Sequence, residues 1–440
     1  MSIEINRNVL IVGGGISGLT AQFELEKKGI SSLLIESENE IGGKIKTVKK
    51  SLSKGDLVVE LGPDSFVPNK DTFELLDSLN LKSDLIKSNK LKTGILKEGK
   101  IKDLPNGFYF MLPTAAIPFL TTSLVSWRGK LRAGLELFQE KRRDNTDESI
   151  AQFVRRRFGD EMLQRLVKPL VKGIFGADGE CQSVNATLPQ FPAMEKKYGS
   201  LLRGMLRSQK RSSPGFLSFK EGMNQVTKSL YQRNRDNILL GTSLINLTRD
   251  SLGGFKAKLT NNQSLKVNNV IFATPPRITA KYLDGLSSEA SDLLSSFKQK
   301  KTRLFYYAYP IRGKIPDHTG LLFDRDLGIN SLSFSSLKFQ KRAPEDMLLV
   351  RASCSAEGSE MQIEELIRKL SGVSMGAIWN DKSESTMPLY EVGHRDRIKR
   401  LYSLLPQDIF LCGNAYEGAS VPDCISLARR VVGSIMQDLK

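Results

Sequence analysis

The stretch from Asn8 to Glu36 constrains the fold more than any other part of the chain. An apolar run at residues 9–12 leads directly into a glycine-rich sequence at residues 13–18, and an amphipathic segment follows as far as Gly29. A second apolar run then ends at Glu36. This order predicts a strand, a phosphate-binding loop, a helix that ends near a left-handed glycine, and a second parallel strand. A βαβ turn with a purely structural role is the alternative interpretation.

The residue types in this unit suit a dinucleotide. Gly13 permits the tight turn, Gly15 lets the backbone approach a pyrophosphate, and Gly18 lets the helix sit close to the strand. The amides at the start of the helix attract an anion. Glu36 stands at the distance from the glycines at which a carboxylate accepts hydrogen bonds from an adenosine ribose. We therefore predict a dinucleotide site at Gly13, Gly14, Gly15, Ile16, Ser17, Gly18 and Glu36.

Chain length and the rarer residues limit the chemistry. With 440 residues the chain can form two or three domains. Its four cysteines lie far apart, and no pair has metal-ligand or redox-motif spacing, so we expect ordinary thiols of a reducing compartment. His318 and His394 are too few for a histidine-based metal site or a hydrolytic triad, so no metal site is predicted. No secretory signal is evident at the start, which predicts a cytoplasmic protein.

The excess of basic residues indicates an anionic partner or substrate. The formal net charge of +17 suits nucleic acid, an anionic membrane surface or a polyanionic substrate. The basic residues are spread along the chain in pairs and short clusters, such as residues 155–157 and 298–301. No nucleic-acid-binding motif and no basic tail accompany them, so we predict no nucleic acid partner. We interpret most of them as solvated faces.

Residues 104–127 contain no charged side chain. This length raises the question of a membrane span, but Pro105, Pro113 and Pro118 interrupt the stretch and argue against a continuous helix. A membrane-dipping loop or a cavity wall fits better, and a buried loop over the core is the alternative. Basic residues follow at once, from Arg128 onward, as in segments that lie on anionic lipid. We therefore expect peripheral association with the inner face of the cell membrane.

Two further stretches resemble FAD-contacting motifs of the amine-oxidase-like flavoprotein superfamily. They are residues 41–44 and residues 60–65. Lys44 stands where arginine is commoner in that superfamily, so the positive charge is kept while the planar, two-pronged phosphate contact is lost. The resemblance implies FAD as the cofactor. It adds Gly42, Gly43, Lys44, Gly62, Pro63, Asp64 and Ser65 to the cofactor-binding residues.

Longer motifs narrow the resemblance to the protoporphyrinogen oxidase family, the flavoenzymes that aromatise a porphyrinogen ring in haem synthesis. The motifs are residues 171–178, 183–189, 194–201, 387–394 and 413–425. With the FAD motifs they extend over almost the whole chain, and the middle of the second half is least distinctive. The resemblance implies an α/β and α+β fold, in which a Rossmann-like FAD-binding domain is joined to a mixed-sheet substrate domain and a helical domain.

The domain boundaries are predicted from the same resemblance. The FAD-binding domain is assigned residues 1–75, 215–277 and 392–440. The substrate-binding domain is assigned residues 76–100 and 278–391. The helical domain is assigned residues 101–214, which include the uncharged stretch, so membrane association is expected there.

The resemblance also assigns residues to the two ends of the cofactor. Leu244 matches a position at which an aliphatic residue lies against the adenine. Ala419, Ser420 and Val421 lead into the last predicted helix, whose N-terminal amides would stabilise negative charge on the flavin pyrimidine. The implied reaction is repeated hydride transfer from a porphyrinogen to flavin N5, with molecular oxygen as acceptor and hydrogen peroxide as product. Gain of aromaticity assists it, so no catalytic residue is assigned.

Three residues are assigned to the substrate. Gly173 matches a family glycine whose backbone lies near the macrocycle, and Phe175 is a neighbour that could instead pack in the core. Tyr109 stands where eukaryotic-type enzymes carry an arginine thought to pair with a propionate, and a phenol donates a hydrogen bond without supplying charge. The substrate therefore stays open. Protoporphyrinogen IX, oxidised to protoporphyrin IX, is the first expectation, and coproporphyrinogen III is the alternative.

Two other classes of protein share parts of the pattern. An FAD amine oxidase would share the FAD motifs, but monoamine oxidases carry a flavin-linked cysteine shortly before the closing glycine motif, and residues 386–390 contain none. A non-catalytic prenyl-protein-binding dissociation inhibitor on the same fold would not need intact flavin loops, and both loops are intact here. A homodimer is left open.

Overall fold

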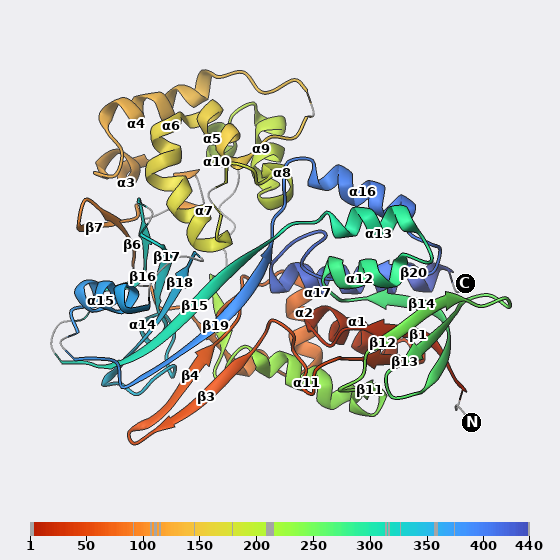
Figure 1. Ribbon diagram of the computed structural model, residues 1–440. Coiled ribbons are helices and arrows are strands. Elements are labelled where there is room, and N and C mark those ends of the chain that lie inside the picture. The colour runs from red at the N-terminus through yellow and green to blue at the C-terminus, as the bar shows by residue number, and fades with distance from the viewer. Residues whose placement is uncertain are drawn as a thin grey trace.

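The computed structural model describes residues 4–90, 92–105, 108–109, 112–113, 116–144, 146–177, 179–207, 215–312, 315, 317–325, 327–355, 360–373 and 375–438. They form a sheet covered by helices on both faces, a second sheet beside it, and a group of helices at one end (Figure 1). Both termini lie in the first of these regions. The predicted mixture of a Rossmann-like unit, a mixed sheet and a helical region is confirmed.

The first region is built on a seven-stranded sheet in the order β11-β2-β1-β14-β13-β12, and β20 pairs with β14. The strands are β1 (Glu4–Val12), β2 (Ser32–Ile35), β11 (Ile238–Leu239), β12 (Leu244–Arg249), β13 (Phe255–Leu259), β14 (Ser264–Phe272) and β20 (Ile409–Leu411). β1 runs parallel to both β2 and β14. Residues 9–12 of β1 are all buried, because both faces of a central parallel strand are covered.

Alternate side chains of β1 enter two separate hydrophobic cores. Val9 and Ile11 belong to the core formed with α1 (Ile16–Glu26), α2 (Lys70–Ser78), α11 (Asn224–Asn234) and α17 (Val421–Asp438). Leu10 and Val12 belong to the core formed with α12 (Pro276–Leu283), α13 (Ser288–Ser295) and α16 (His394–Leu404). The period of two along a strand therefore places α1 and α17 together on one face of the sheet.

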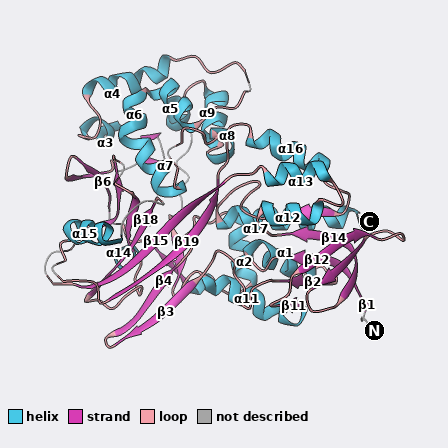
Figure 2. Cartoon of the chain, in the orientation of Figure 1, coloured by secondary structure: helices cyan, strands magenta, loops and turns pink. Residues whose placement is uncertain are grey.

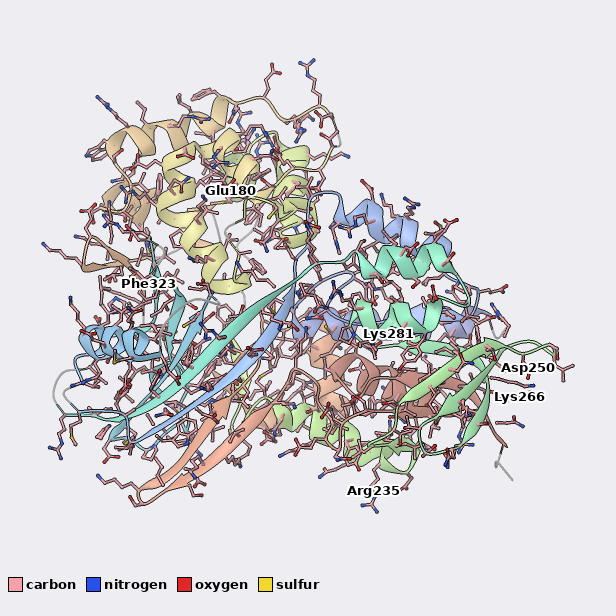
Figure 3. The ribbon with its side chains drawn as sticks, in the orientation of Figure 1. Glu180, Arg235, Asp250, Lys266, Lys281 and Phe323 are labelled. Carbon is pink, nitrogen blue, oxygen red and sulfur yellow. The ribbon has the colours of Figure 1, made fainter. Side chains whose placement is uncertain are left out.

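The second region is a seven-stranded sheet in the order β19-β15-β18-β17-β16-β6-β7. Its strands are β6 (Lys92–Lys97), β7 (Lys100–Asp103), β15 (Gln299–Pro310), β16 (His318–Phe323), β17 (Ile329–Phe334), β18 (Met347–Cys354) and β19 (Trp379–Pro388). All neighbouring pairs are antiparallel except β16 and β6. α14 (Ser335–Lys338) and α15 (Glu360–Ser371) accompany it, and Phe323 is buried in the core on the α15 face (Figure 3).

Shorter strands connect the regions. The hairpin of β3 (Thr47–Leu52) and β4 (Gly55–Glu60) packs Leu57 and Val59 against β15 and β18. β5 (Leu85–Lys87) pairs with β10 (Leu217–Phe219), and β8 (Phe108–Tyr109) pairs with β9 (Leu112–Pro113). β7 continues to Asp103, past the boundary predicted at residue 100. The three-domain division with its predicted boundaries stays a proposal.

The helical region contains many short helices, gathered at one end of the molecule (Figure 2). They are α3 (Ala116–Thr121), α4 (Trp127–Gly134), a 3-10 turn (Leu135–Phe138), α5 (Ile150–Phe158), α6 (Asp160–Met162), a π-turn (Leu163–Val167), α7 (Lys168–Phe175), α8 (Val184–Thr187), α9 (Gln190–Tyr198) and α10 (Leu201–Arg207). Their apolar core surrounds the fully buried ion pair of Arg157 with Glu136. Ser200 donates its hydroxyl to the same Glu136 carboxylate at 2.5 Å, so the buried charges are satisfied.

Two helix ends differ from the sequence-based expectation. The first-turn acids before Ile150 predicted a helix starting at about Thr146, but α5 begins at Ile150 and is capped by Ser149, whose hydroxyl accepts from the Gln152 amide. The apolar stripe predicted a second helix closed by Gly173, but α7 continues to Phe175 and is capped by Gly176, which has φ 69°. A side-chain cap and a left-handed glycine compete with hydrophobic spacing in setting helix ends.

Charged side chains include Arg235, Lys266 and Lys281 in the first region and Glu180 in the helical region (Figure 3). Across the parts of the chain that the structure describes, no helix combines the length and the apolar character that a membrane crossing needs. Among those same residues, no three His, Cys, Asp or Glu side chains gather where they could hold a metal ion.

Candidate active site

The loop between β1 and α1 leaves no room for side chains at two of its glycines. A Cβ on Gly13, which has φ +113°, would lie 2.8 Å from the carbonyl oxygen of Ala273. A Cβ on Gly18 would lie 2.0 Å from the carbonyl oxygen of Gly13. Around Gly15 the opposite holds, because a Cβ there meets nothing within 4 Å. The loop is therefore tightly packed against the sheet and open at Gly15, as a pyrophosphate cradle requires.

The start of α1 is available to an anion. Its N-cap is Gly15, which has no side chain to accept from the first amides of the helix. Ile16 and Ser17 are buried, since α1 lies between the sheet and α17. A helix N-terminus with unpaired amides and a positive dipole end binds phosphate well. The predicted phosphate contacts of residues 13–18 thus lie on one short, continuous surface.

Glu36 lies at the end of β2 and holds the loop together. Its Oε2 accepts from the Gly14 amide at 2.6 Å, and its Oε1 accepts from the Glu38 amide at 2.9 Å. The Ser37 hydroxyl also donates to Oε1 at 3.0 Å. A carboxylate has further lone pairs, so these contacts leave Glu36 able to accept from a ribose hydroxyl as well.

The second glycine pair packs directly against the first loop. The Gly42 amide donates to the carbonyl oxygen of Gly14 at 2.9 Å. Gly42 has φ 113°, and a Cβ on it would lie 2.7 Å from the carbonyl oxygen of Ile45. A Cβ on Gly43 would lie 3.3 Å from the Cα of Gly15. The structure thus brings the two predicted FAD motifs into contact.

Lys44 reaches across to the second sheet. Its Nζ donates to the carbonyl oxygen of Thr386 on β19 at 2.6 Å. Burial lowers the pKa of the Lys44 ammonium, and the nearby Cys424 sulfur acts in the opposite direction. Cys424 lies on α17 beside Ser17, so Lys44 stands between the N-termini of the two helices and β19. Its predicted phosphate contact stays a prediction, and the contact with Thr386 is one that the sequence motif did not indicate.

Residues 62–65 form the turn after β4. A Cβ on Gly62 would lie 1.8 Å from the carbonyl oxygen of Lys44, so only glycine fits. After Pro63, the Asp64 carboxylate accepts from Lys338 Nζ at 2.9 Å and from the Ser65 hydroxyl at 2.6 Å. Burial raises the pKa of Asp64, but Lys338 and Arg351 outweigh it and the net shift is downward. Asp64 is therefore ionised and tied to the second sheet.

The N-terminus of α17 approaches that of α1 on the same side of the first sheet (Figure 1). Ser420 and Asp423 cap α17, because the Ser420 hydroxyl accepts from the Asp423 amide at 3.2 Å while Asp423 Oδ2 accepts from the Ser420 amide at 3.1 Å. A Cβ on Gly418 would lie 2.5 Å from Asp423. Ala419, Ser420 and Val421 thus form a rigid helix start, and their contact with a flavin pyrimidine stays a prediction.

Leu244 is a buried residue of the hydrophobic core beside the first sheet. It starts β12, close to Thr242, whose amide donates to the carbonyl oxygen of Glu36 at 2.8 Å. The Leu244 side chain is buried, and its carbonyl oxygen accepts from the Tyr282 hydroxyl at 2.8 Å. This position is near the ribose end of the site, and the adenine contact stays a prediction.

The substrate residues have distinct environments. A Cβ on Gly173 would lie 2.4 Å from Leu322, so this glycine lets α7 pack closely on β16 and β17. Phe175 packs against the helical core, which favours the core-packing alternative for its ring. The backbone of Tyr109 lies in β8, and its side chain lies outside the described residues. Asp178, in the motif at residues 171–178, and several residues at the start of the uncharged stretch 104–127 also lie outside them.

Taken together, the residues present fit a dinucleotide cofactor. An open cradle at Gly15 leads along the surface between two converging helix N-termini, with the Glu36 carboxylate at one end. Sequence patterns missed the contacts that join this surface to the second sheet, namely those of Thr386, Lys338 and Arg351. These residues are far from the motifs in sequence, so no local spacing could have indicated them.

The chain is similar to known proteins over nearly its full length. The profile of the family described as flavin containing amine oxidoreductase matches residues 16–436. The chain is 28% identical to a coproporphyrinogen III oxidase of Bacillus subtilis (strain 168), with 98% of each chain covered. It is 26% identical to a chloroplastic protoporphyrinogen oxidase of Oryza sativa subsp. japonica, with 96% of this chain and 86% of that one covered. A crystal structure from Exiguobacterium sp. 255-15, provisionally named a protoporphyrinogen oxidase, superposes with a TM-score of 0.84 at 25% identity, covering 98% and 99% of the two chains.

Proposed function

The chain belongs to the flavin-containing amine oxidoreductase family and its cofactor is FAD, and we propose that it oxidises coproporphyrinogen III to coproporphyrin III. The observation that carries this proposal is the similarity to the Bacillus subtilis coproporphyrinogen III oxidase, which covers 98% of both chains. A match confined to the glycine loops would indicate only the cofactor. Here the second sheet and the helical region, which would enclose the substrate, match as well.

The chain's own residues supply binding and orientation. Bound FAD would supply the hydride acceptor for the substrate, and it would pass the two electrons to molecular oxygen to give hydrogen peroxide. The N-terminus of α1 would offer amides to the pyrophosphate, and the N-terminus of α17 would turn its positive dipole end toward the negative charge that develops on the flavin. The close packing of Gly173 sets α7 over the second sheet, on the side where a flat substrate would enter.

Protoporphyrinogen IX, the first expectation from the sequence, is the second candidate. The rice relative carries the name of a protoporphyrinogen oxidase. An apolar surface stripe, formed by Trp127, Leu131, Leu135 and Phe138, also suits an enzyme that draws an apolar substrate from a membrane. We propose that this stripe lies peripherally on anionic lipid, because Arg128 and other basic residues flank it.

Anaerobic mixing followed by air tests the proposed function. The purified flavoprotein is mixed with coproporphyrinogen III or protoporphyrinogen IX without oxygen, and bleaching of the flavin absorbance is followed. Air is then admitted, and porphyrin fluorescence, oxygen uptake and peroxide are measured. We expect both substrates to bleach the flavin, coproporphyrinogen with the higher kcat/KM, and three peroxides per porphyrin. Bleaching by amines but by neither porphyrinogen would overturn the proposal.

A further inference from the structure

The two faces of the second sheet differ in chemistry. The face toward α15 is packed with large apolar side chains, among them Phe305, Tyr307 and Val350. Residues opposite one another on paired strands share a face, so the strand register defines the other face. Beside the buried Leu304 and Leu349 and the exposed carboxylate of Asp381, it carries a group of polar side chains: Thr302 and Tyr306 on β15, Ser331 and Ser333 on β17, Arg351 and Ser353 on β18, and Ser383 and Ser385 on β19. This face, with its row of hydroxyls and the guanidinium of Arg351, is called the hydroxyl face below.

The hydroxyl face is turned toward the proposed substrate site. At one end, Ser331 Oγ donates to the carbonyl oxygen of Gly173 on α7 at 3.4 Å. At the other end, Tyr306 packs with Leu57 of the β3–β4 hairpin. The seryl side chains between these two contacts are partly exposed. A packed core would not place so many hydroxyls in a row, whereas the wall of a polar binding site would.

Arg351 lies in the middle of this face. On one side it pairs in register with Ser333, and on the other side with Tyr306. It is partly exposed, and among the described residues no hydrogen bond or ion pair to its guanidinium is found. The Tyr306 hydroxyl is already engaged with Ser383 Oγ at 3.1 Å, so it does not compete for Arg351.

The neighbouring charges leave Arg351 in excess. Lys338 pairs with Asp64 at 2.9 Å, and Arg342 pairs with Glu60 at 3.3 Å. Each of these carboxylates thus has its own ion-paired cation, and Arg351 is a third cation that acts on Asp64 only through space. Without a hydrogen-bonded partner, a partly buried guanidinium loses part of its hydration and recovers little of it. The planar guanidinium can donate two parallel hydrogen bonds to a carboxylate, which is the anionic group that a porphyrinogen carries.

We propose that Arg351 binds a propionate carboxylate of the porphyrinogen, with Ser333 and Ser353 as further donors. This assignment rests on the proposed function and supplies the charge that Tyr109 cannot. Arg351 lies close enough to Asp64 of the FAD motif to lower the pKa of its carboxyl, so it would hold the anionic rim of the macrocycle near the cofactor. Contacts on the hydroxyl face would then help the protein to distinguish substrates by the number of their carboxylates.

Binding of the oxidised product tests this without turnover. Coproporphyrin III is titrated into the FAD-loaded protein, and the shift of its Soret band is recorded. Arg351→Gln should weaken binding roughly tenfold to a hundredfold, and Arg351→Lys, which keeps the charge, should weaken it less. Lys382→Gln is the matched control, because Lys382 lies on β19 on the opposite face, within 3.5 Å of Glu360. The tetramethyl ester of coproporphyrin III should bind wild type and Arg351→Gln equally, since it has no carboxylate.

The outcomes are distinguishable. If Arg351→Gln binds coproporphyrin III like the wild type while keeping its FAD, the assignment of Arg351 is overturned and the proposed function stands. If Arg351→Gln loses its FAD whereas Lys382→Gln keeps it, the anion belongs to the cofactor and the assignment is likewise overturned. If the wild type binds neither coproporphyrin III nor its tetramethyl ester, the proposed function itself fails and the assignment of Arg351 fails with it.

Discussion

The Nε2 of His394 lies 2.9 Å from the carbonyl oxygen of Tyr416, in the loop that leads to α17. A carbonyl only accepts, so this nitrogen carries the proton. The imidazole also stacks on Tyr390, with ring centroids 4.2 Å apart, and the Tyr390 hydroxyl donates to the carbonyl oxygen of Asn414 at 2.6 Å. Two buried rings thus hold the loop that precedes the proposed flavin contact.

We predict that His394→Phe loosens this loop. The substitution keeps the stacking on Tyr390 but leaves the Tyr416 carbonyl without its donor, which should cost about 1–3 kcal/mol of unfolding free energy. FAD retention should fall as well, because the start of α17 is less firmly held. Urea unfolding and the flavin content after gel filtration measure the two effects. Equal values for His394→Phe and wild type would show that the contact is not needed.

The same histidine should give the protein a pH dependence. Burial lowers the pKa of His394 from 6.5, so the unfolded chain binds this proton more readily than the folded one. The contribution of neutral His394 to the unfolding free energy is therefore fully present above pH 6.5 and is lost as the pH falls below that value. His394→Gln keeps a hydrogen-bond donor but cannot be protonated. As the pH is lowered from about 7 to 5, the unfolding free energy of wild type should therefore fall relative to that of His394→Gln.

The comparison with wild type matters because another buried group acts in the opposite direction. Burial raises the pKa of Glu60 to about 6, although Arg342 partly opposes this. The folded state therefore binds this proton more readily, and stability falls as the pH rises from 4.5 to about 6. That contribution is present in both proteins and cancels in the difference. A difference that stays constant from pH 7 to pH 5 would contradict the role given to His394.

Gly15→Val should give a folded protein without flavin. The structure has open space where the new side chain would begin, so the apolar core is untouched, while the valine would occupy the pyrophosphate cradle. We expect at least a tenfold loss of FAD affinity, with little change in far-ultraviolet circular dichroism. Gly285→Val is the control, since a Cβ there also meets nothing within 4 Å and the position is far from the cradle in sequence. Normal FAD content in Gly15→Val would refute the cradle.

The FAD should be bound without a covalent link. Burial raises the pKa of the Cys424 thiol to about 11, and burial raises the pKa of Cys412 as well, so both sulfurs near the site are protonated and poorly nucleophilic at neutral pH. Acid or heat denaturation should therefore release all of the flavin into the supernatant, where its absorbance is measured. Flavin that stays with the precipitated chain would contradict this.

Local patterns predicted the parts of the fold that are set by local chemistry. The unit from Asn8 to Glu36 was predicted from glycine placement and apolar runs, and the structure shows β1, α1 and β2 in that order. The motif at Gly42 was recognised only through its resemblance to the amine-oxidase-like flavoproteins. These features depend on backbone conformation and on burial on both faces of a strand, and both leave a mark within a few residues.

Contacts between distant segments could not be predicted in this way. The pairs Lys44 with Thr386 and Asp64 with Lys338 join the turns beside the β3–β4 hairpin to β19 and α14, and neither Thr386 nor Lys338 has a distinctive neighbourhood in the sequence. Helix ends were misplaced where a cap outweighed apolar spacing, as at Ser149. In the uncharged stretch, composition alone could not separate a buried side chain from an exposed one.

That last distinction decides how membrane association should be tested. Phe119 is 8% exposed and belongs to the helical core, so replacing it would damage the fold whether or not the protein meets a membrane. Trp127 and Leu131 are 72% and 70% exposed and lie one turn apart on α4, outside the apolar core of the helical region, although the Trp127 ring also lies 4.6 Å from Nζ of the buried Lys130. We predict that the double variant Trp127→Ser, Leu131→Ser keeps its FAD and its unfolding free energy within about 1 kcal/mol. It should bind anionic vesicles at least tenfold more weakly than wild type in a sedimentation assay. Binding of the wild type should weaken as salt rises, because the flanking basic side chains are screened.

Leu252→Ser is the control, since Leu252 is 86% exposed in the loop between β12 and β13, outside the helical region. If wild type ignores anionic vesicles at low salt, the stripe has another use and the membrane proposal fails.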